Sequence, residues 1–256
     1  GLLLPNGRRI FNVAIRTIQL HKGQAIYGVG GGITWDSTWE SEYREVHQKA
    51  AVLYRKQARF KLITTGRISQ KNLLFEEQHL ERLTKASRYF SFPFDPEELR
   101  QKIEKECQAC DFHQDYRLRI TLSKSGEMEL SRQILTPLSP SFCKAKLCLQ
   151  EADLQMPFTY FKTTHRPHFS LGEQEIIYHN VAGELLETSI GNLVLKINGK
   201  LYTPPTSQGI LPGIYRQHLL ETGQVKEKIM TLEDLNQAET IYGCNAVRGL
   251  YELEVI

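Results

Sequence analysis

Hydrophobic and polar residues alternate along several short stretches of this chain, which is the pattern of strands with one buried face. Residues 116–122 and 127–135 alternate in this way, and the turn residues at 124–126 between them predict a hairpin. Asn198-Gly199, directly after residues 192–197, is a dipeptide typical of tight hairpins. Further strands are predicted at residues 11–17, 25–29, 60–65, 144–149, 175–180 and 200–202.

Helices are predicted where charged and apolar residues recur with helical spacing after a capping residue. The first covers residues 39–55, with Ser37 or Thr38 as its N-cap. Two more helices cover residues 75–92 and 97–109. A fourth begins near Pro212 and runs towards Thr222, and a fifth begins near Leu232 with Thr231 as its cap. Strands and helices mix without a repeated strand–helix–strand unit, so an α+β fold is predicted.

The main body of the chain is expected to have two lobes. Two prolines within residues 136–140 resist both helix and inner strand, which makes this segment the best candidate for a linker. The predicted parts are residues 1–57, a small lobe at residues 58–140 and a large lobe at residues 141–256. A chain of 256 residues with 41% hydrophobic content can bury a core of this size.

Composition narrows the class of protein. Lys+Arg 32 against Asp+Glu 29 gives a net charge of +3, too balanced to indicate a nucleic-acid surface. No apolar run approaches the roughly 20 residues that cross a bilayer, and no charged-then-apolar leader opens the sequence. We therefore expect a soluble cytoplasmic protein with no nucleic-acid or membrane partner.

The five cysteines indicate neither a disulfide framework nor a metal site. Cys107 and Cys110, with His113 nearby, could form half a zinc site, but both cysteines lie in a predicted helix and a second close ligand pair is missing. Cys143 and Cys148 would point to opposite faces of a strand. No metal is predicted.

Four motifs follow one another in the second half of the chain. They are YFKTTHR at 160–166, GELLETSIGNL at 183–193, LYTPP at 201–205 and GILPGIYR at 209–216. In this order and at these spacings they resemble the class IV aminotransferase family of pyridoxal-phosphate (PLP) enzymes, and within it the aminodeoxychorismate lyases. The resemblance covers roughly residues 58–256. It implies the two-lobed fold-type IV architecture, preceded here by a short β-hairpin and helix.

The resemblance implies that Lys162 bonds covalently to the cofactor aldehyde and later moves protons. It also places Glu187 against the pyridine nitrogen, where a carboxylate keeps the ring protonated and improves it as an electron sink. Taken alone, Lys162 could be a surface lysine, and Glu187 a solvent-facing acid at a strand edge. The order of the downstream motifs favours the functional interpretation of both.

The cofactor phosphate needs a cation and backbone donors. Arg82, in HLERL at 79–83, matches the family's phosphate-binding arginine, although it could instead pair with Glu77 or Glu81 on a helix surface. Ile214 and Tyr215 stand at the start of a predicted helix, where free N–H groups attract anions. The segment GCNA at 243–246 resembles the family's last phosphate loop, with Asn245 as a further donor.

Arginine side chains are expected to bind the substrate carboxylates. By the resemblance, Arg67 and Arg119 lie on small-lobe strands that line the active site, and Arg166 and Arg248 are weaker candidates. For each of them an exposed salt bridge is the alternative. The family usually has Glu-Thr before its small-lobe arginine, whereas this chain has Thr64-Thr65. That departure concerns the substrate side of the pocket only.

Residues 1–57 resemble the last segment of the chorismate-binding enzymes, which include aminodeoxychorismate synthase. In that family an arginine and a glycine-rich turn hold substrate carboxylates, and acids like Glu42 and Glu45 help to hold magnesium. A site assembled from distant strands cannot form from two strands and one helix. We therefore interpret this segment as a remnant of a fused synthase–lyase, without chorismate chemistry of its own.

The expected activity is that of a PLP-dependent 4-amino-4-deoxychorismate lyase, which releases pyruvate and gives 4-aminobenzoate for folate biosynthesis. A homodimer is implied by the same resemblance. Two alternatives remain. One is a branched-chain or D-amino acid aminotransferase on the same scaffold, and the other is a non-catalytic remnant that keeps the fold as a binding module.

Overall fold

The computed structural model describes residues 1–11, 16–54, 58–150, 154, 156–166 and 174–256. The chain divides into two compact units, Gly1–Ala58 and Arg59–Ile256. Among the described residues, no helix is long and apolar enough to span a membrane. Each unit has its own architecture and is described by itself below.

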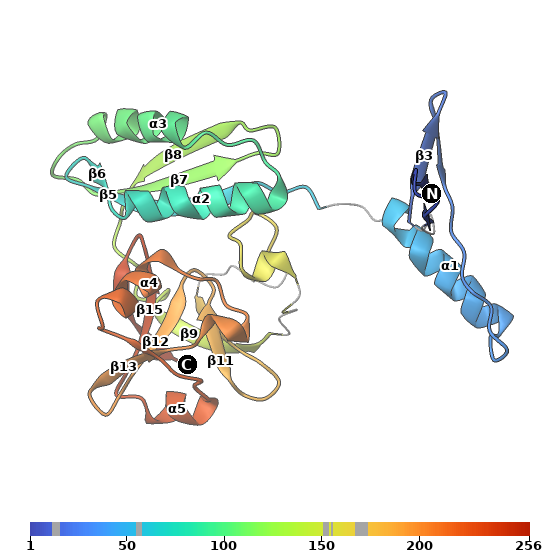
Figure 1. Cartoon of the computed structure of the whole chain (residues 1–256). Helices are drawn as coiled ribbons and strands as arrows, with labels where there is room; N and C mark the ends of the chain where they lie inside the picture. Colours follow the sequence, from blue (N-terminus) through green and yellow to red (C-terminus); the bar gives the residue numbers. More distant parts are fainter. Residues whose placement is uncertain (12–15, 55–57, 151–153, 155, 167–173) are drawn as a thin grey trace. The chain divides into compact units, whose positions relative to one another are not determined.

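The first unit consists of two small hairpins and one helix (Figure 1). The hairpins are β1 (Leu2–Leu3) with β2 (Arg9–Ile10), and β3 (Ile18–His21) with β4 (Gln24–Tyr27). The helix α1 (Trp39–Tyr54) begins after Thr38, whose Oγ1 accepts a hydrogen bond from the Ser41 N–H at 3.3 Å. The predicted strand at residues 11–17 falls largely on residues 12–15, which lie outside the described residues.

The second unit begins with a four-stranded antiparallel sheet in the order β6-β5-β7-β8. Its elements are β5 (Leu62–Ser69), β6 (Asn72–Leu73), α2 (Glu76–Phe90), α3 (Pro96–Gln108), β7 (Tyr116–Leu122) and β8 (Met128–Ile134). The helices α2 and α3 pack on this sheet over a core that includes Leu83, Leu99 and Leu118 (Figure 1). The predicted strand 116–122 is confirmed, whereas strand 60–65 was placed too early, because Gly66 and Arg67 still pair with β7.

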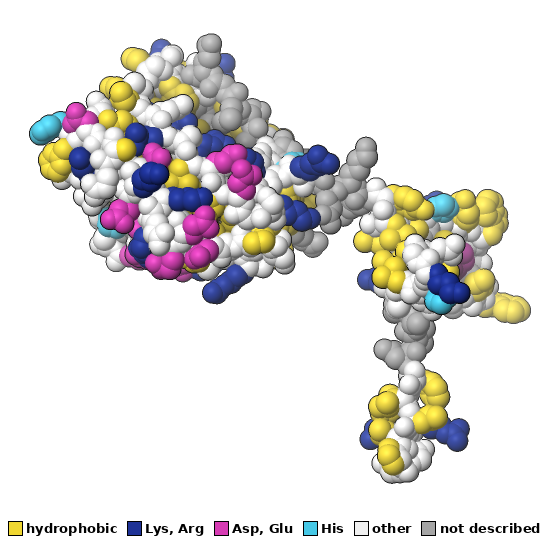
Figure 2. All heavy atoms as spheres, turned by 90° about the horizontal axis from the view of Figure 1, so that it is seen from above, with side chains coloured by type: hydrophobic (Ala, Val, Ile, Leu, Met, Phe, Trp, Pro, Cys, Tyr) yellow, Lys and Arg dark blue, Asp and Glu magenta, His cyan; other side chains and the backbone are white. Residues whose placement is uncertain are grey.

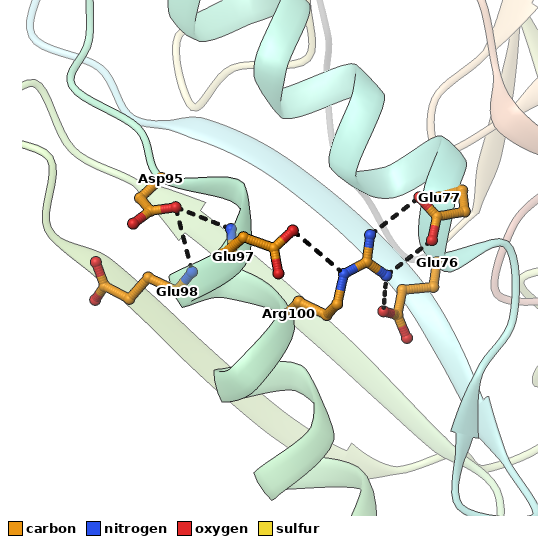
Figure 3. Close-up of polar contacts among 6 residues, drawn as sticks. All are labelled: Glu76, Glu77, Asp95, Glu97, Glu98 and Arg100. Atoms are coloured by element: carbon orange, nitrogen blue, oxygen red, sulfur yellow. Dashed lines mark hydrogen bonds and ion pairs between the residues drawn. The ribbon is translucent and has the colours of Figure 1, made fainter.

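Polar contacts hold α3 and α2 together. The Asp95 carboxylate caps α3 by accepting the Glu97 and Glu98 N–H groups (Figure 3). One turn later, the Arg100 guanidinium contacts Glu76 at 2.9 Å and Glu77 at 2.8 Å, both in the first turn of α2 (Figure 3). Arg100 is therefore an arginine whose charge is neutralised by neighbouring carboxylates.

The large lobe is built on an eight-stranded sheet in the order β11-β10-β9-β16-β15-β12-β13-β14. Because β11 also pairs with β12, the first six strands of this order close into a barrel. The strands are β9 (Lys144–Leu149), β10 (Glu175–His179), β11 (Leu185–Thr188), β12 (Asn192–Ile197), β13 (Lys200–Thr203), β14 (Lys226–Glu227), β15 (Thr240–Asn245) and β16 (Gly249–Val255). Short helices α4 (Ile214–Glu221) and α5 (Leu232–Gln237) complete it, with 3₁₀ turns at Pro157–Thr159 and Thr206–Gln208.

Local sequence signals explain several boundaries in this lobe. Asn198 and Gly199 both have positive φ, 50° and 70°, as the tight turn between β12 and β13 requires. Thr231 and Asp234 form a reciprocal capping box at the start of α5, which confirms the predicted cap. The sequence interpretation missed β11, β14, β15 and β16, and it described Gly243–Asn245 as a loop although these residues end β15.

Candidate active site

Lys162 lies where the large lobe touches the small-lobe sheet. The Lys162 carbonyl accepts the Ile63 N–H at 2.9 Å, and the Thr164 N–H donates to the Lys61 carbonyl at 2.9 Å. Between them, Thr163 is fully buried and forms an antiparallel bridge with Leu62. Because side chains alternate along such a segment, Lys162 points away from this buried face. It faces a cavity instead.

Glu187 and Asn192 lie opposite each other at the point where β11 meets β12 and the barrel closes. The Glu187 carboxylate is buried, accepts the Leu211 N–H at 3.3 Å and lies 3.9 Å from the Arg166 guanidinium. The Asn192 amide donates to the Leu211 carbonyl at 2.9 Å. The solvent-facing alternative for Glu187 is therefore wrong. This carboxylate is held inside the protein, next to a cation.

The start of α4 provides an anion-binding end to the same cavity. Its N-cap, Gly213, makes no capping side-chain bond, and the N–H groups of Ile214 and Tyr215 donate to no described residue. A Cβ atom at Gly213 would lie 1.9 Å from the Asn192 Oδ1, so only glycine fits there. The dipole and free N–H groups of this helix end would favour a phosphate.

Arg82 lies beside this helix start. Its Nη2 donates to the Pro212 carbonyl at 2.6 Å. Neither predicted alternative partner binds it, since Glu77 pairs with Arg100 and Glu81 pairs with Lys85. The structure thus brings the Arg82 guanidinium to the free N–H groups of α4, although 130 residues separate Arg82 from Pro212.

The Asn245 side chain makes hydrogen bonds within the turn after β15. Its Oδ1 accepts the Val247 and Arg248 N–H groups at 3.0 and 2.9 Å, and its Nδ2 points to the Ile190 carbonyl at 3.4 Å. Asn245 lines the cavity, but its amide organises the turn after β15. Its role as a further phosphate donor stays a prediction.

Burial and neighbouring charges shift the pKa values of Lys162 and Glu187. Burial, then Arg82, Arg166 and Arg119, lower the pKa of Lys162 to about 7, against the attraction of Glu187. Burial raises the pKa of Glu187 to about 7, although Arg166 opposes this change. Near neutral pH a large fraction of Lys162 is thus an uncharged amine, the form that can attack an aldehyde.

Two cavities meet at Lys162. The inner one is lined by the groups described above, among them Arg82, Glu187, Asn192 and Gly213. The outer one has a volume of about 550 Å³. Both share Lys162, Arg166, Ile190 and Asn245, so the lysine amine stands between an inner polar site and a larger outer space.

The outer cavity contains several arginines, though not all those predicted. Arg119 lines it, as do Arg166 and Arg248. Arg67 does not line it and instead contacts Asp115 at 2.5 Å, so its predicted place in the substrate pocket is not supported. Arg117 lines the cavity and was missed, although its spacing of two residues from Arg119 on one strand puts both on the same face.

His79 is a second residue that the sequence interpretation missed. It is fully buried on α2, with its Nδ1 2.6 Å from the Thr64 hydroxyl. Burial, then Arg82 and Lys162, lower its pKa to about 3, so the imidazole is neutral. Its place one helical turn before Arg82 was the available signal. Gly66 is required beside it, because a Cβ there would lie 2.6 Å from the His79 Nε2.

Comparison with family models divides the chain at nearly the same place as its structure. The model of the amino-transferase class IV family matches residues 61–256. The model of the chorismate binding enzymes matches residues 1–55. The resemblances inferred from the motifs of both segments are confirmed.

Individual relatives are distant. A probable branched-chain-amino-acid aminotransferase of Thermotoga maritima is 25% identical over 68% of each chain. A putative aminodeoxychorismate lyase of Schizosaccharomyces pombe is 30% identical over 29% of this chain and 34% of its own length. An uncharacterised protein of Haemophilus influenzae is 37% identical over 27% of this chain, and the match spans about a third of that relative (35%).

Solved structures share the fold of the second unit. A putative amino-acid aminotransferase of Mesorhizobium loti is 27% identical with a TM-score of 0.68, over 77% of this chain and 100% of that one. A putative 4-amino-4-deoxychorismate lyase of Legionella pneumophila is 20% identical with a TM-score of 0.63, and the match covers 76% of this chain and 82% of that one. A hypothetical aminotransferase of Mycobacterium tuberculosis, solved in its PLP-bound form, is 17% identical with a TM-score of 0.64. This match covers 76% of this chain and 80% of that one.

These matches confirm the predicted fold-type IV architecture and support PLP as the cofactor. The structure adds a half-buried lysine with a lowered pKa between a buried carboxylate and an arginine at a helix start. With a family model that covers residues 61–256, the chain belongs to the class IV aminotransferase family of enzymes.

Proposed function

We propose that this chain is a PLP-dependent lyase that converts 4-amino-4-deoxychorismate into 4-aminobenzoate and pyruvate. The observation that carries the proposal is the charge of the outer cavity beside Lys162. Arg117, Arg119, Arg166 and Arg248 line it, and the described lining residues include no aspartate or glutamate. A substrate with two carboxylates, such as aminodeoxychorismate, complements this wall.

The donors that line the inner cavity match the polar groups of PLP. The N–H groups of Ile214 and Tyr215, with Arg82, would hold the phosphate, and Glu187 would face the ring nitrogen. Lys162 would bond to the aldehyde. When bound, PLP withdraws electrons from the substrate carbon that carries the amine, which makes the hydrogen on that carbon acidic.

The residues of this chain then have to move one proton. The neutral Lys162 Nζ takes the proton from the ring carbon that bears nitrogen, because its lowered pKa leaves the amine free to accept it near neutral pH. The C–O bond to the enolpyruvyl group breaks, and the leaving enolate of pyruvate gains a proton. The ring becomes aromatic. Protons and electrons balance, so neither an oxidant nor a second substrate is required.

The organisation of the chain also favours the lyase. A segment matched by the chorismate binding enzymes and a class IV segment occur on one polypeptide. Fusion commonly joins enzymes of consecutive steps, and aminodeoxychorismate is the product of a chorismate-binding synthase.

The test is incubation of the PLP-loaded protein with aminodeoxychorismate, with 4-aminobenzoate detected by fluorescence and pyruvate by coupled reduction. Equal amounts of both products are expected. A parallel incubation with leucine or D-alanine and 2-oxoglutarate should give no glutamate. If glutamate forms and aminodeoxychorismate stays intact, the chain is an aminotransferase and the lyase proposal is wrong.

The aminotransferase is retained as the second candidate because of the apolar part of the same cavity. Ile63, Leu138, Phe142 and Val247 line it and could hold a branched side chain. The Thermotoga maritima relative, named as a probable branched-chain aminotransferase, is similar over 68% of both chains. A protein that binds no PLP in an absorbance titration would support the non-catalytic alternative.

Assembly and location remain predictions. We propose that the chain forms a homodimer, and an obligate two-fold contact would bury about 2,000 Å² or more. Sedimentation at several concentrations would test the dimer. A cytoplasmic location is likewise expected, and fractionation of cells that express the protein would test it.

A further inference from the structure

Three arginines of the outer cavity lack the carboxylate partners that Arg67, Arg100 and Arg132 have. Arg117, Arg119 and Arg248 form no ion pair with a described carboxylate. By contrast, Arg100 is surrounded by glutamates on α2 and α3 (Figure 3). Several uncompensated cations in one cavity repel one another, so an anionic ligand is the missing partner.

Arg119 and Arg117 lie at different depths along β7. Arg119 pairs in register with Thr65, and Arg117 pairs with Arg67, two positions farther from the Leu62 bridge that holds the Lys162 segment. Two residues of a strand span about 7 Å. Arg119 is half-buried and its charge acts on the Lys162 amine, whereas Arg117 is exposed at the outer end.

Arg248 reaches the outer end from the other lobe. Its Nη1 donates to the Thr136 carbonyl, and its backbone N–H donates to the Asn245 Oδ1 at 2.9 Å. Neither contact neutralises the charge. Burial, then the like charge of Arg117 and that of Arg67, lower the pKa of Arg248, which is consistent with its position close to Arg117. Arg67 itself is already paired with Asp115.

We infer that Arg117 and Arg248 form an outer anion subsite that binds a second carboxylate, while Arg119 serves an inner carboxylate beside Lys162. The spacing of the arginines on β7 suits two carboxylates on opposite parts of one ring-sized molecule. This inference rests on the proposed use of the outer cavity as the substrate site. It specifies dicarboxylates as the ligand class and makes Arg117 and Arg248 specificity-determining residues.

The experiment compares two probes that need no turnover, benzoate and benzene-1,3-dicarboxylate, by calorimetry on the PLP-loaded protein at constant ionic strength. The dicarboxylate should bind roughly tenfold or more tightly than benzoate, as expected for an added charge-assisted contact. Arg117→Leu and Arg248→Leu should each remove most of this preference and leave benzoate affinity unchanged. Arg117→Lys should restore part of it.

The matched control is Arg100→Leu, which removes an arginine outside the cavity and should leave the preference intact. An unchanged preference in both Arg117→Leu and Arg248→Leu would overturn the subsite, as would an equal loss of benzoate binding. Inorganic phosphate should not compete with benzoate, since a general anion trap would show such competition. If the preference depends on Arg117 but no 4-aminobenzoate forms, the subsite stands and the lyase proposal fails.

Discussion

The two units of this protein contrast in what they bury. None of the described residues of Gly1–Ala58 is buried, and Leu20 is 80% exposed. In Arg59–Ile256 the leucine at position 118 is fully enclosed, and four clusters of buried side chains fill the lobes. Figure 2 shows hydrophobic side chains spread over the surface of the first unit, whereas basic and acidic groups intermingle on the face shown of the second.

A sequence segment can thus keep its local structure without the means to stabilise it. The hairpins and α1 of the first unit form from turn and capping signals, yet none of their apolar side chains is fully buried, so they gain little energy from burial. The second unit buries enough apolar surface to hold charged groups such as Lys162 and Glu187 in perturbed states. Stability and the candidate chemistry therefore belong to the same unit.

The largest expected effect is that of Lys162→Ala, which should abolish covalent cofactor attachment and lower turnover by roughly 10²–10⁴-fold or more. Borohydride reduction and peptide mapping of the unaltered protein should place the pyridoxyl group on Lys162. Lys196→Ala, at an exposed pair with Glu239, is the control and should behave like the parent. A label on Lys144 or Lys196 would refute the assignment.

A pair of leucine truncations tests the contrast in burial directly. Leu118→Ala should lower the free energy of unfolding by about 2–5 kcal/mol, since it opens a cavity in the small-lobe core. Leu20→Ala should change it by no more than about 0.5 kcal/mol. Urea denaturation followed by circular dichroism measures both values. A large effect at Leu20 would mean that the first unit is covered in solution.

A moderate effect of pH on the rate of cofactor attachment to Lys162 is expected. Because the pKa of Lys162 is lowered to about 7, the neutral amine predominates above this pH and falls about tenfold for each unit below it. The rate of cofactor attachment should therefore be about tenfold lower at pH 6 than at pH 8. Rapid-mixing absorbance spectroscopy gives this rate. A midpoint near the ordinary lysine value of 10.5 would show that the amine is not desolvated.

The smallest effect should follow deletion of residues 1–58. The remaining unit has its own core and contains every residue of the candidate site, so PLP affinity should stay within about twofold and the free energy of unfolding within about 0.5 kcal/mol. Absorbance titration with PLP and urea denaturation provide the two measurements. Loss of PLP binding in a soluble, folded deletion variant would mean that the first unit helps to build the site.

Features that depend on neighbouring residues could be predicted from the sequence alone. Strands 116–122 and 192–197, the turn at Asn198-Gly199 and the Thr231 cap follow from alternation, turn chemistry and capping, which act over a few positions. The motifs around Lys162 were likewise sufficient to identify the family. All these signals are local, so one chain displays them without reference to the rest of the molecule.

Which distant groups meet depends on the fold of the whole second unit. Glu187 became a buried carboxylate because β11 closes the barrel against β12, and Arg82 reached a helix start 130 residues away. Nothing in the neighbouring sequence distinguishes Arg67 from Arg117. In the structure, however, Arg67 pairs with Asp115, whereas Arg117 lines the outer cavity. Burial, ion pairing and pKa depend on through-space distance, and spacing along the chain does not fix that distance.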